Sequence, residues 1–271
     1  MPELPEVETI KSEISPYLIG RRITNVTLFW ERMVRQPSAA EFRERLNGQR
    51  ITGVGRRGKY LLLSLCGGDT LVIHLKLTGS LWLKLPPEGD KFVRAAISFD
   101  DGSHIYFRDP RKFGKMWLVS DKSAATGDLG PEPLEPDFTP EVLATRLQRH
   151  KIPVKAALLD QRVIAGVGNL YADEALFAAK VHPMRPADGL TPEEIKRLRR
   201  SISDVLVHGI DNKGASVENY YRPDGTKGNA HAEFKVARQR GFPCPNCGTP
   251  IQYMKVRGRG TYFCPKCQPP A

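Results

Sequence analysis

The chain has 271 residues, a formal net charge of +11 at pH 7 and an isoelectric point near 9.5. This length suffices for one large or two ordinary domains, and a hydrophobic fraction of 40% is normal for a globular protein. No apolar run is long enough to span a membrane and no signal peptide precedes the acidic start, so we expect a cytosolic protein. The positive charge favours a polyanionic partner, with nucleic acid as the default.

The first residues of the chain could carry covalent chemistry. Methionine aminopeptidases remove Met1 when the second residue is small, which would expose the secondary amine of Pro2. An α-amino group titrates at roughly 7.7–8.0, so part of it is neutral and nucleophilic at pH 7. Three carboxylates follow closely: Glu3, Glu6 and Glu8. The same residues also suit the first turn of a helix, which an apolar series at helical spacing predicts: Val7, Ile10, Ile14 and Leu18.

Residues 20–120 are predicted to be mostly β structure. Short segments rich in β-branched or aromatic residues predict seven strands: 22–30, 49–54, 59–65, 70–77, 95–99, 104–107 and 115–119. With hairpin signals at Gly67-Gly68 and Asp101-Gly102, this pattern is typical of a sandwich or a flattened barrel. Residues 42–46 suit a short helix. Cys66 stands alone beside an apolar run and is expected to be a buried structural thiol.

The second half of the chain is predicted to be helical after a proline-rich linker over residues 121–138. Thr139 and Thr191, each followed by proline, are plausible N-caps. Helices over 154–161 and 169–180 flank the turn 165–168, and Asn169 at such a helix start could bind a phosphate. A simple helical hairpin is the alternative reading of this turn. The polar, glycine-rich stretch 213–232 is expected to be a mobile, functional loop.

Four of the five cysteines lie in two Cys-Pro-x-Cys pairs with sixteen residues between the inner cysteines: Cys244, Cys247, Cys264 and Cys267. This spacing is that of a structural zinc site, and four thiolates leave no open position for catalysis. The intervening residues 251–263 suit a β-hairpin with Arg259 near its tip. An arginine there could clamp a phosphate, and a solvated surface charge is the alternative.

Several motifs, taken in this order, resemble the bacterial formamidopyrimidine-DNA glycosylases of the MutM type over essentially the whole chain. They are Pro2–Glu8, Gly58-Lys59, His74–Gly79, Asp109–Gly114, Gly166–Glu174, Arg259–Thr261 and the four cysteines. The resemblance implies an α+β multidomain fold. Its parts would be an N-terminal helix plus β-sandwich (1–120), a linker (121–138), a helix-two-turn-helix domain (139–232) whose loop 213–232 covers the lesion, and a β-hairpin zinc finger (233–271).

The resemblance also implies base excision repair of oxidised purines, chiefly 8-oxoguanine and formamidopyrimidines, in duplex DNA. A Schiff base on the N-terminal proline would be followed by β,δ-elimination. The implied catalytic residues are Pro2, Glu3, Lys59 and Arg259, and the implied cofactor is one structural Zn²⁺. The implied DNA contacts are His74, Leu77, Arg111, Phe113, Lys151, Lys155, Asn169 and Arg259, with Ser216 and Tyr220 in the lesion loop. Without the resemblance, Lys59 is an ordinary strand lysine, and Leu77 and Phe113 are core residues.

Some residues depart from the family pattern. Leu77 stands where methionine is common, the loop 215–220 lacks the usual Ser-Thr and basic residue, and 91–94 and 237–240 also differ. The departures bear on the preference among damaged bases and do not touch the proposed chemistry. Two alternatives are open: an endonuclease VIII-like enzyme for oxidised pyrimidines, and a zinc-ribbon protein that senses damage without cutting. The expected protein is a monomer that acts on DNA in the bacterial cytoplasm, associated with the nucleoid, and has no membrane partner.

Overall fold

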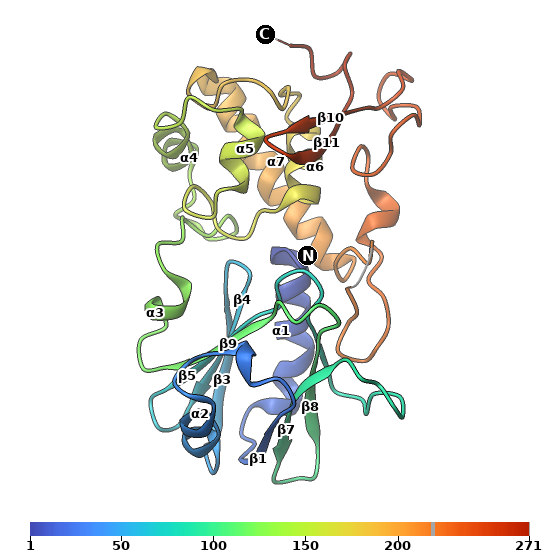
Figure 1. The fold of residues 1–271 in the computed structure, drawn as a ribbon. Helices are drawn as coiled ribbons and strands as arrows, with labels where there is room; N and C mark the ends of the chain where they lie inside the picture. The colour runs from blue at the N-terminus through green and yellow to red at the C-terminus, as the bar shows by residue number, and fades with distance from the viewer. Residues whose placement is uncertain (218–219, 271) are drawn as a thin grey trace. The chain divides into compact units, whose positions relative to one another are not determined.

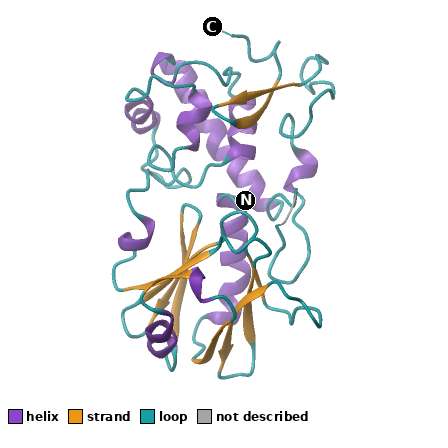
Figure 2. Ribbon diagram, viewed as in Figure 1, coloured by secondary structure: helices purple, strands orange, loops and turns teal. Residues whose placement is uncertain are grey.

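The computed structural model describes residues 1–217 and 220–270, which form a mixed α+β fold of two compact units (Figures 1 and 2). The first unit comprises Met1–Asp128 together with Asn212–Asn229. The second comprises Leu129–Asp211 and the chain from Ala230 onward. The expected α+β class is thereby confirmed. None of the described helices is both long and apolar enough to cross a membrane.

The described part of the first unit contains two sheets, together with short helical elements and a long N-terminal helix. One sheet has the order β1-β7-β8-β6, formed by Ile23–Leu28, Val93–Phe99, His104–Arg108 and Ser80–Trp82. The other has the order β2-β9-β5-β4-β3, formed by Val34–Gln36, Lys115–Val119, Thr70–His74, Tyr60–Leu65 and Ile51–Arg57. Neighbouring strands are antiparallel except β2 and β9. The short helical elements are η1 (Glu31–Met33), α2 (Ala39–Leu46) and α3 (Ser123–Thr126).

Helix α1 (Leu4–Leu18) supplies much of the core of this unit, and Figure 1 shows it alongside the strands. Its apolar series is fully buried and joins one core cluster with residues from both sheets: Val7, Ile10, Ile14 and Leu18. The helix begins with a capping box, in which Glu3 and Glu6 each accept a backbone N–H of the other. The helix predicted from periodicity is therefore present, and it begins one residue after Glu3.

The observed strands differ from the predicted ones in informative places. The strand predicted over 70–77 ends at His74, because Lys76 adopts a left-handed backbone with φ of 55° and turns the chain away. Strands β2 and β6 are too short to have been recognised from alternation. Cys66 is exposed, so the expectation of a buried thiol was wrong: it lies just past the end of β4, in the turn to β5.

The second unit is a set of helices joined to a two-stranded hairpin. Its helices are α4 (Pro140–Leu147), α5 (Val154–Leu159), α6 (Asn169–Ala178), η2 (Ala187–Gly189), α7 (Pro192–Asp211) and η3 (Ala230–Glu233). Strands β10 (Gln252–Val256) and β11 (Arg259–Phe263) pair in antiparallel register. Arg257 and Gly258 connect them with φ of 43° and 78°, which is the backbone of a tight two-residue hairpin turn.

The predicted loop 213–232 is divided between the two units. Residues 212–229 pack with the first unit, although the expected domain limits grouped them with the helices. Hydrogen bonds from the loop to α1, and between the two ends of the loop, account for this placement. They are described below. The division between Asp128 and Leu129 falls inside the stretch 121–138.

Candidate functional site

The start of α1 holds the proposed nucleophile and acid side by side. Pro2 and Glu3 are both buried, and Glu3 is the N-cap residue. The backbone N–H of Glu3 donates to Oε2 of Glu6 at 2.7 Å, which fixes the direction in which the chain enters the helix. The helix-start reading of the N-terminal acids is confirmed by this capping box, and the catalytic role of Pro2 and Glu3 stays a prediction.

Glu8, the third acid of this segment, has a structural role. Its Oε2 accepts a hydrogen bond from Nε of Arg56 on β3 at 2.8 Å, and Lys11 pairs with its other oxygen. Burial would raise the pKa of Glu8, but the bonds to Lys11 and Arg56 outweigh it and lower the pKa. The ion pair therefore anchors α1 to the five-stranded sheet.

Lys59 directly precedes β4, and His74 is the last residue of the neighbouring strand β5. Gly58, with φ of 54°, makes the turn between β3 and β4, and Lys59 follows it as a buried residue. Burial, with smaller contributions from the charges of Lys76 and Lys59, lowers the pKa of His74 to about 3. The imidazole is therefore neutral at pH 7. Its Nδ1 accepts the backbone N–H of Lys76 at 2.9 Å, so its proton is on Nε2, where it can donate to a phosphate oxygen.

Three further predicted residues are presented on two turns that share one buried anchor. Leu77 and Phe113 are 39% and 40% exposed, so the alternative reading of them as core residues is wrong. The guanidinium of Arg111 lies 4.8 Å from the centre of the Phe113 ring. An exposed leucine and a stacked arginine–phenylalanine pair have the chemistry needed to wedge into a base stack and to pair with a base.

Asp109, which is 1% exposed, fixes both of these turns. Its Oδ2 accepts the N–H of Gly114 at 2.7 Å, and its Oδ1 accepts the N–H of Arg111 at 3.2 Å and the hydroxyl of Thr78. The turn containing Leu77 is thereby tied to the turn containing Arg111. Close packing adds to this, because a Cβ on Gly114 would lie 2.3 Å from the Phe107 ring. The carboxylate of Asp109 and the small residue Gly114 together fix the shape of the two turns.

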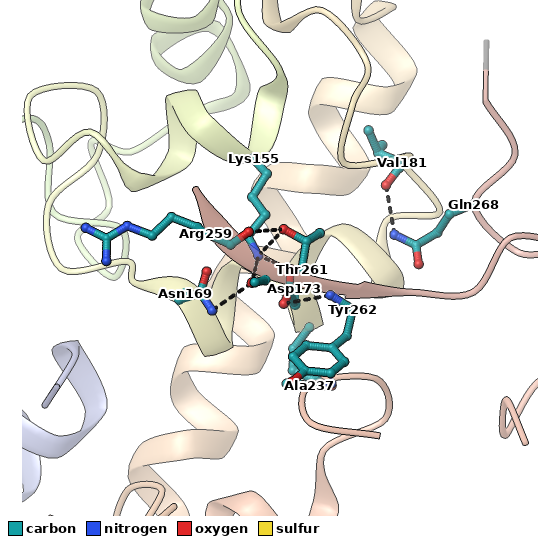
Figure 3. A network of polar contacts seen from close by, with 11 residues as sticks. Lys155, Asn169, Asp173, Val181, Ala237, Arg259, Thr261, Tyr262 and Gln268 are labelled. Carbon is teal, nitrogen blue, oxygen red and sulfur yellow. Dashed lines mark hydrogen bonds and ion pairs between the residues drawn. The ribbon is translucent and has the colours of Figure 1, made fainter. Parts of the chain in front are cut away.

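The predicted phosphate contact Lys155 is a buried structural cation instead, which corrects that expectation. It is 0% exposed, and its Nζ lies 2.6 Å from Oδ1 of Asp173 on α6. It also donates to the carbonyl of Gly260 and to the hydroxyl of Thr261, each at 2.8 Å (Figure 3). In this structure the ammonium group is fully buried, and it contacts Asp173 and the hairpin instead of facing solvent.

Asn169 also contacts the hairpin beside this ion pair. Asn169 is the first residue of α6, while Gly168 is the N-cap and provides no side-chain cap. The amide Nδ2 of Asn169 donates to the carbonyl of Gly260 at 3.0 Å, next to Arg259, whose side chain extends away from the network in Figure 3. Arg259 and Lys151 are exposed. Lys155 thus positions the hairpin that presents Arg259.

The two loop residues predicted to contact a lesion base are buried in the first unit. The hydroxyl of Ser216 donates to the carbonyl of Tyr220 at 3.0 Å and accepts the N–H of Gly228 at 2.9 Å. The ring of Tyr220 joins the core cluster around α1. In this conformation both side chains hold the loop in place. Glu218 and Asn219, which belong to the departing loop 215–220, lie outside the described residues.

The four predicted cysteines converge as a metal site. Their sulfur atoms all lie within 4.8 Å of one another, with Cys244 3.8 Å from Cys267 and Cys247 3.5 Å from Cys264. A tetrahedron with Zn–S bonds of about 2.3 Å has S–S edges of about 3.8 Å, so the residues fit one zinc ion. The knuckles pack with Phe177 and Val236, which links the zinc site to α6.

Three acids that support the site were not assigned roles from the sequence: Asp109, Asp173 and Glu174. Glu174, next to Asp173 on α6, accepts backbone N–H groups of Lys235, Val236 and Ala237 at 2.8–3.1 Å. Each acid lies within a motif noted above, but a motif does not say which of its charges are buried. For Asp173 and Glu174 the available signal was their position in an otherwise apolar segment, residues 170–178.

Comparisons with known protein families agree along the chain. Residues 1–116 match the model for the formamidopyrimidine-DNA glycosylase N-terminal domain, and residues 129–220 match the model for the H2TH domain of the same enzymes. Residues 241–270 match the zinc finger found in FPG and IleRS. The earlier resemblance is confirmed by these matches.

Individual relatives and solved structures match over nearly their full length. The chain is 46% identical to formamidopyrimidine-DNA glycosylase of Chloroflexus aurantiacus, over 99% of this chain and 98% of the relative. It is similar to the crystal structure of MutM (Fpg) from Thermus thermophilus, with 40% identity, a TM-score of 0.90 and 100% of both chains covered. Lactococcus lactis Fpg in complex with abasic-site DNA gives 33% identity and a TM-score of 0.91, covering 99% and 100% of the two chains.

Proposed function

Because this chain belongs to the formamidopyrimidine-DNA glycosylase family, whose members are bifunctional glycosylases and abasic-site lyases, we propose that it removes oxidised purines from duplex DNA through its own N-terminal proline. The observation that carries the proposal is the buried Pro2-Glu3 pair at the start of α1, fixed by Glu6. Removal of Met1 turns the nitrogen of Pro2 into a secondary amine at that place.

The chemistry starts once the damaged nucleotide has left the base stack. The lone pair of the Pro2 nitrogen attacks C1′ of the deoxyribose, and the bond from C1′ to the base breaks with its electrons going to the base, which takes up a proton. Glu3 exchanges protons with the sugar as its ring opens. The resulting iminium is cationic, and it makes the hydrogens on C2′ acidic.

Strand cleavage follows from that acidity. Loss of a C2′ proton expels the 3′ phosphate by β-elimination, and a second elimination expels the 5′ phosphate. Water then releases the sugar fragment from Pro2. Lys59 is the proposed second proton donor and phosphate contact, and Arg259 assists the second elimination. Glu3 offsets the positive charge of the iminium.

The remaining predicted residues form the DNA-binding surface in this proposal. Leu77 and Phe113 fill the space left by the extruded nucleotide, and Arg111 pairs with the base opposite it. His74, Asn169 and Arg259 bind phosphates, with Lys151 as an outlying contact. Zinc, held by the four cysteines, stabilises the hairpin that carries Arg259. The protein acts as a monomer in the bacterial cytoplasm, on nucleoid DNA.

Borohydride trapping tests the central step. Incubation with an 8-oxoguanine duplex and borohydride should crosslink the chain to DNA, and mass spectrometry should locate the adduct at Pro2. Pro2→Gly and a form that retains Met1 should each lose excision while binding the duplex. An adduct on any other residue, or normal turnover by either form, would contradict the proposal.

A second substrate class is tested in the same assay. One similar structure is a complex of wild-type Lactococcus lactis Fpg with DNA containing an oxidised pyrimidine, at 34% identity and a TM-score of 0.91. Parallel single-turnover rates on duplexes with 8-oxoguanine and with thymine glycol therefore decide the preference. A faster rate on 8-oxoguanine is expected, and a faster rate on thymine glycol would favour the endonuclease VIII-like alternative.

A further inference from the structure

Residues 212–217 and 220–229 are held against helix α1 at two points, each made by a carboxylate of the helix. Oε1 of Glu6 accepts the backbone N–H of Ala215 at 2.7 Å. Oε1 of Glu13 accepts from Nε of Arg222 at 2.8 Å and lies 2.6 Å from its second terminal nitrogen. Glu6 and Glu13 are seven residues apart, which places them on the same face of the helix two turns apart.

The anchor at Glu6 also reaches the proposed catalytic residues. The same carboxylate that accepts from Ala215 accepts the N–H of Glu3 through its other oxygen. Space is tight here, because a Cβ on Gly214 would lie 2.9 Å from Cγ of Glu6. A change at Glu6 would therefore disturb the catalytic start and the loop together.

The anchor at Glu13 belongs to the loop alone. Arg222 opens a compact turn, in which its N–H donates to the carbonyl of Thr226 at 2.9 Å and its Nη1 donates to the hydroxyl of Thr226 at 3.1 Å. The next residue, Pro223, accepts the N–H of Leu83 beyond β6 at 2.8 Å. The ion pair joins this preformed turn to α1, with the two side chains 25% and 21% exposed.

Tyr220 lies between the two anchors. A Cβ on Gly214 would lie 2.9 Å from Cγ of Glu6 and 2.9 Å from the Tyr220 ring, which places this ring next to the first anchor. Burial raises the pKa of its hydroxyl, and the charges of Glu6 and Glu13 raise it further. Its ring packs in the core cluster of the first unit. The path of the described loop along α1 is therefore set at Ala215, Tyr220 and Arg222.

We propose that Glu13 and Arg222 are a positioning pair that holds this loop where it acts on an extruded damaged base, and that they thereby favour base excision over cleavage at sites that have already lost the base. The inference rests on the proposed function. An abasic sugar offers no base for the loop to contact, while the reactions at Pro2 and Glu3 are common to both substrates. The pair is seven residues along α1 from the carboxylate that serves the catalytic start, so it can be changed separately.

Glu13→Gln and Arg222→Gln test the pair through the ratio of two single-turnover rates. One rate is release of 8-oxoguanine, and the other is strand cleavage of a preformed abasic duplex. Each variant should lower the first rate about three- to tenfold and leave the second within about twofold, as expected for loss of a partly buried ion pair. Equal losses on both substrates, or no loss on either, would overturn the inference.

The two variants change the net charge in opposite directions, which distinguishes loss of the ion pair from a general change in attraction to DNA. Glu13→Gln raises the net charge and Arg222→Gln lowers it, so an effect on DNA affinity alone would move the excision rate in opposite directions, whereas loss of the pair moves it in one direction. Arg200→Gln, which removes an exposed arginine paired with Asp204 at 3.5 Å in the other unit, is the matched control and should leave the ratio unchanged.

Exchange of the two charges completes the test. The double variant Glu13→Arg/Arg222→Glu should recover most of the excision rate lost in the single variants, and a double variant slower than both would overturn the pairing argument. Wild-type protein provides the check on the underlying function. If it releases no 8-oxoguanine and forms no adduct at Pro2, the proposed function fails. If it does both and the variants match it, only this inference fails.

Discussion

The turn at residues 109–114 and the hairpin tip at residues 259–261 each present an arginine, but they are fixed in different ways. Asp109 accepts hydrogen bonds from neutral donors, namely two backbone N–H groups and one hydroxyl. The hairpin tip is held instead by a fully buried ion pair between Lys155 and Asp173. Loss of one neutral donor leaves a single polar group without its partner, whereas loss of one member of a buried ion pair leaves an unpaired charge, which costs more. The hairpin should therefore be the more sensitive region to loss of one side chain.

Of the changes considered, loss of the zinc site should have the largest effect on the stability of the hairpin and on DNA affinity. Cys264→Ser removes a buried thiolate from a site whose metal binding contributes on the order of 10 kcal/mol in small zinc domains. We expect zinc content to fall from one ion per chain toward none and DNA affinity to fall by more than about tenfold, because Arg259 loses its support. Inductively coupled plasma emission spectrometry measures the zinc content, and fluorescence anisotropy of a labelled duplex measures the DNA affinity. Cys66→Ser, at an exposed cysteine outside the site, should change neither.

Removing one member of the buried pair should have the next largest effect. Lys155→Met leaves Asp173 buried without its cation, which should cost about 3–5 kcal/mol of unfolding free energy. The double variant Lys155→Met/Asp173→Leu should recover most of this, because no charge remains buried. Chelator-driven zinc release and circular dichroism follow this unit. A double variant as unstable as the single one would show that packing, and not the charge, causes the loss.

The single variant also has a pH signature. Burial raises the pKa of Asp173 to about 7 even with Lys155 present, so it rises further without the lysine. A raised carboxyl pKa gives stability that is present below the unfolded pKa near 3.8 and is lost as pH rises through the folded value. Lys155→Met should therefore lose less stability at pH 5.5 than at pH 8. The reverse order would indicate that Asp173 stays ionised in the variant.

The sequence predicts one of these two regions better than the other. Cysteine spacing and the glycine at the hairpin turn are local signals, so the zinc site and β10–β11 were found from the chain alone. Lys155 and Asp173 are eighteen residues apart, and nothing local distinguishes a buried lysine from an exposed one. The same limit applies to Asp109, whose partner Thr78 is on a distant turn, and to Ser216 and Tyr220, whose burial depends on packing against α1.

A smaller loss is expected where neutral donors hold the turn. Asp109→Asn keeps an acceptor for Thr78 and Arg111 but turns an NH₂ group toward the N–H of Gly114, which loses its partner. We expect a cost of about 1–3 kcal/mol. All three tryptophans, Trp30, Trp82 and Trp117, lie in the first unit, so their fluorescence during urea unfolding reports on this unit. A loss as large as that of Lys155→Met would remove the distinction between the two regions.

His74 gives the smallest effect at neutral pH and a change of opposite sign to Asp173 on acidification. Its pKa of about 3 lies below the unfolded value near 6.5, mainly because the ring is buried. A depressed pKa gives stability that is present above the unfolded value and is lost as pH falls toward the folded one. Between pH 7 and pH 5 the neutral imidazole should therefore cost the wild type about 2 kcal/mol.

His74→Asn should remove that acid-dependent loss, since asparagine does not titrate. Urea unfolding followed by tryptophan fluorescence gives the unfolding free energy at pH 7 and at pH 5. The drop between the two pH values should be larger for the wild type than for the variant. Because Lys76 donates its N–H to His74, protonation also breaks the bond that shapes the turn leading to Leu77. Acid should thus destabilise the turn of Leu77, which Asp109 joins to residues 109–114. Rising pH should instead destabilise the hairpin of the Lys155→Met variant. Equal acid sensitivity of wild type and His74→Asn would mean that His74 is already protonated in the folded protein at pH 5, and that the turn keeps its shape without a neutral imidazole.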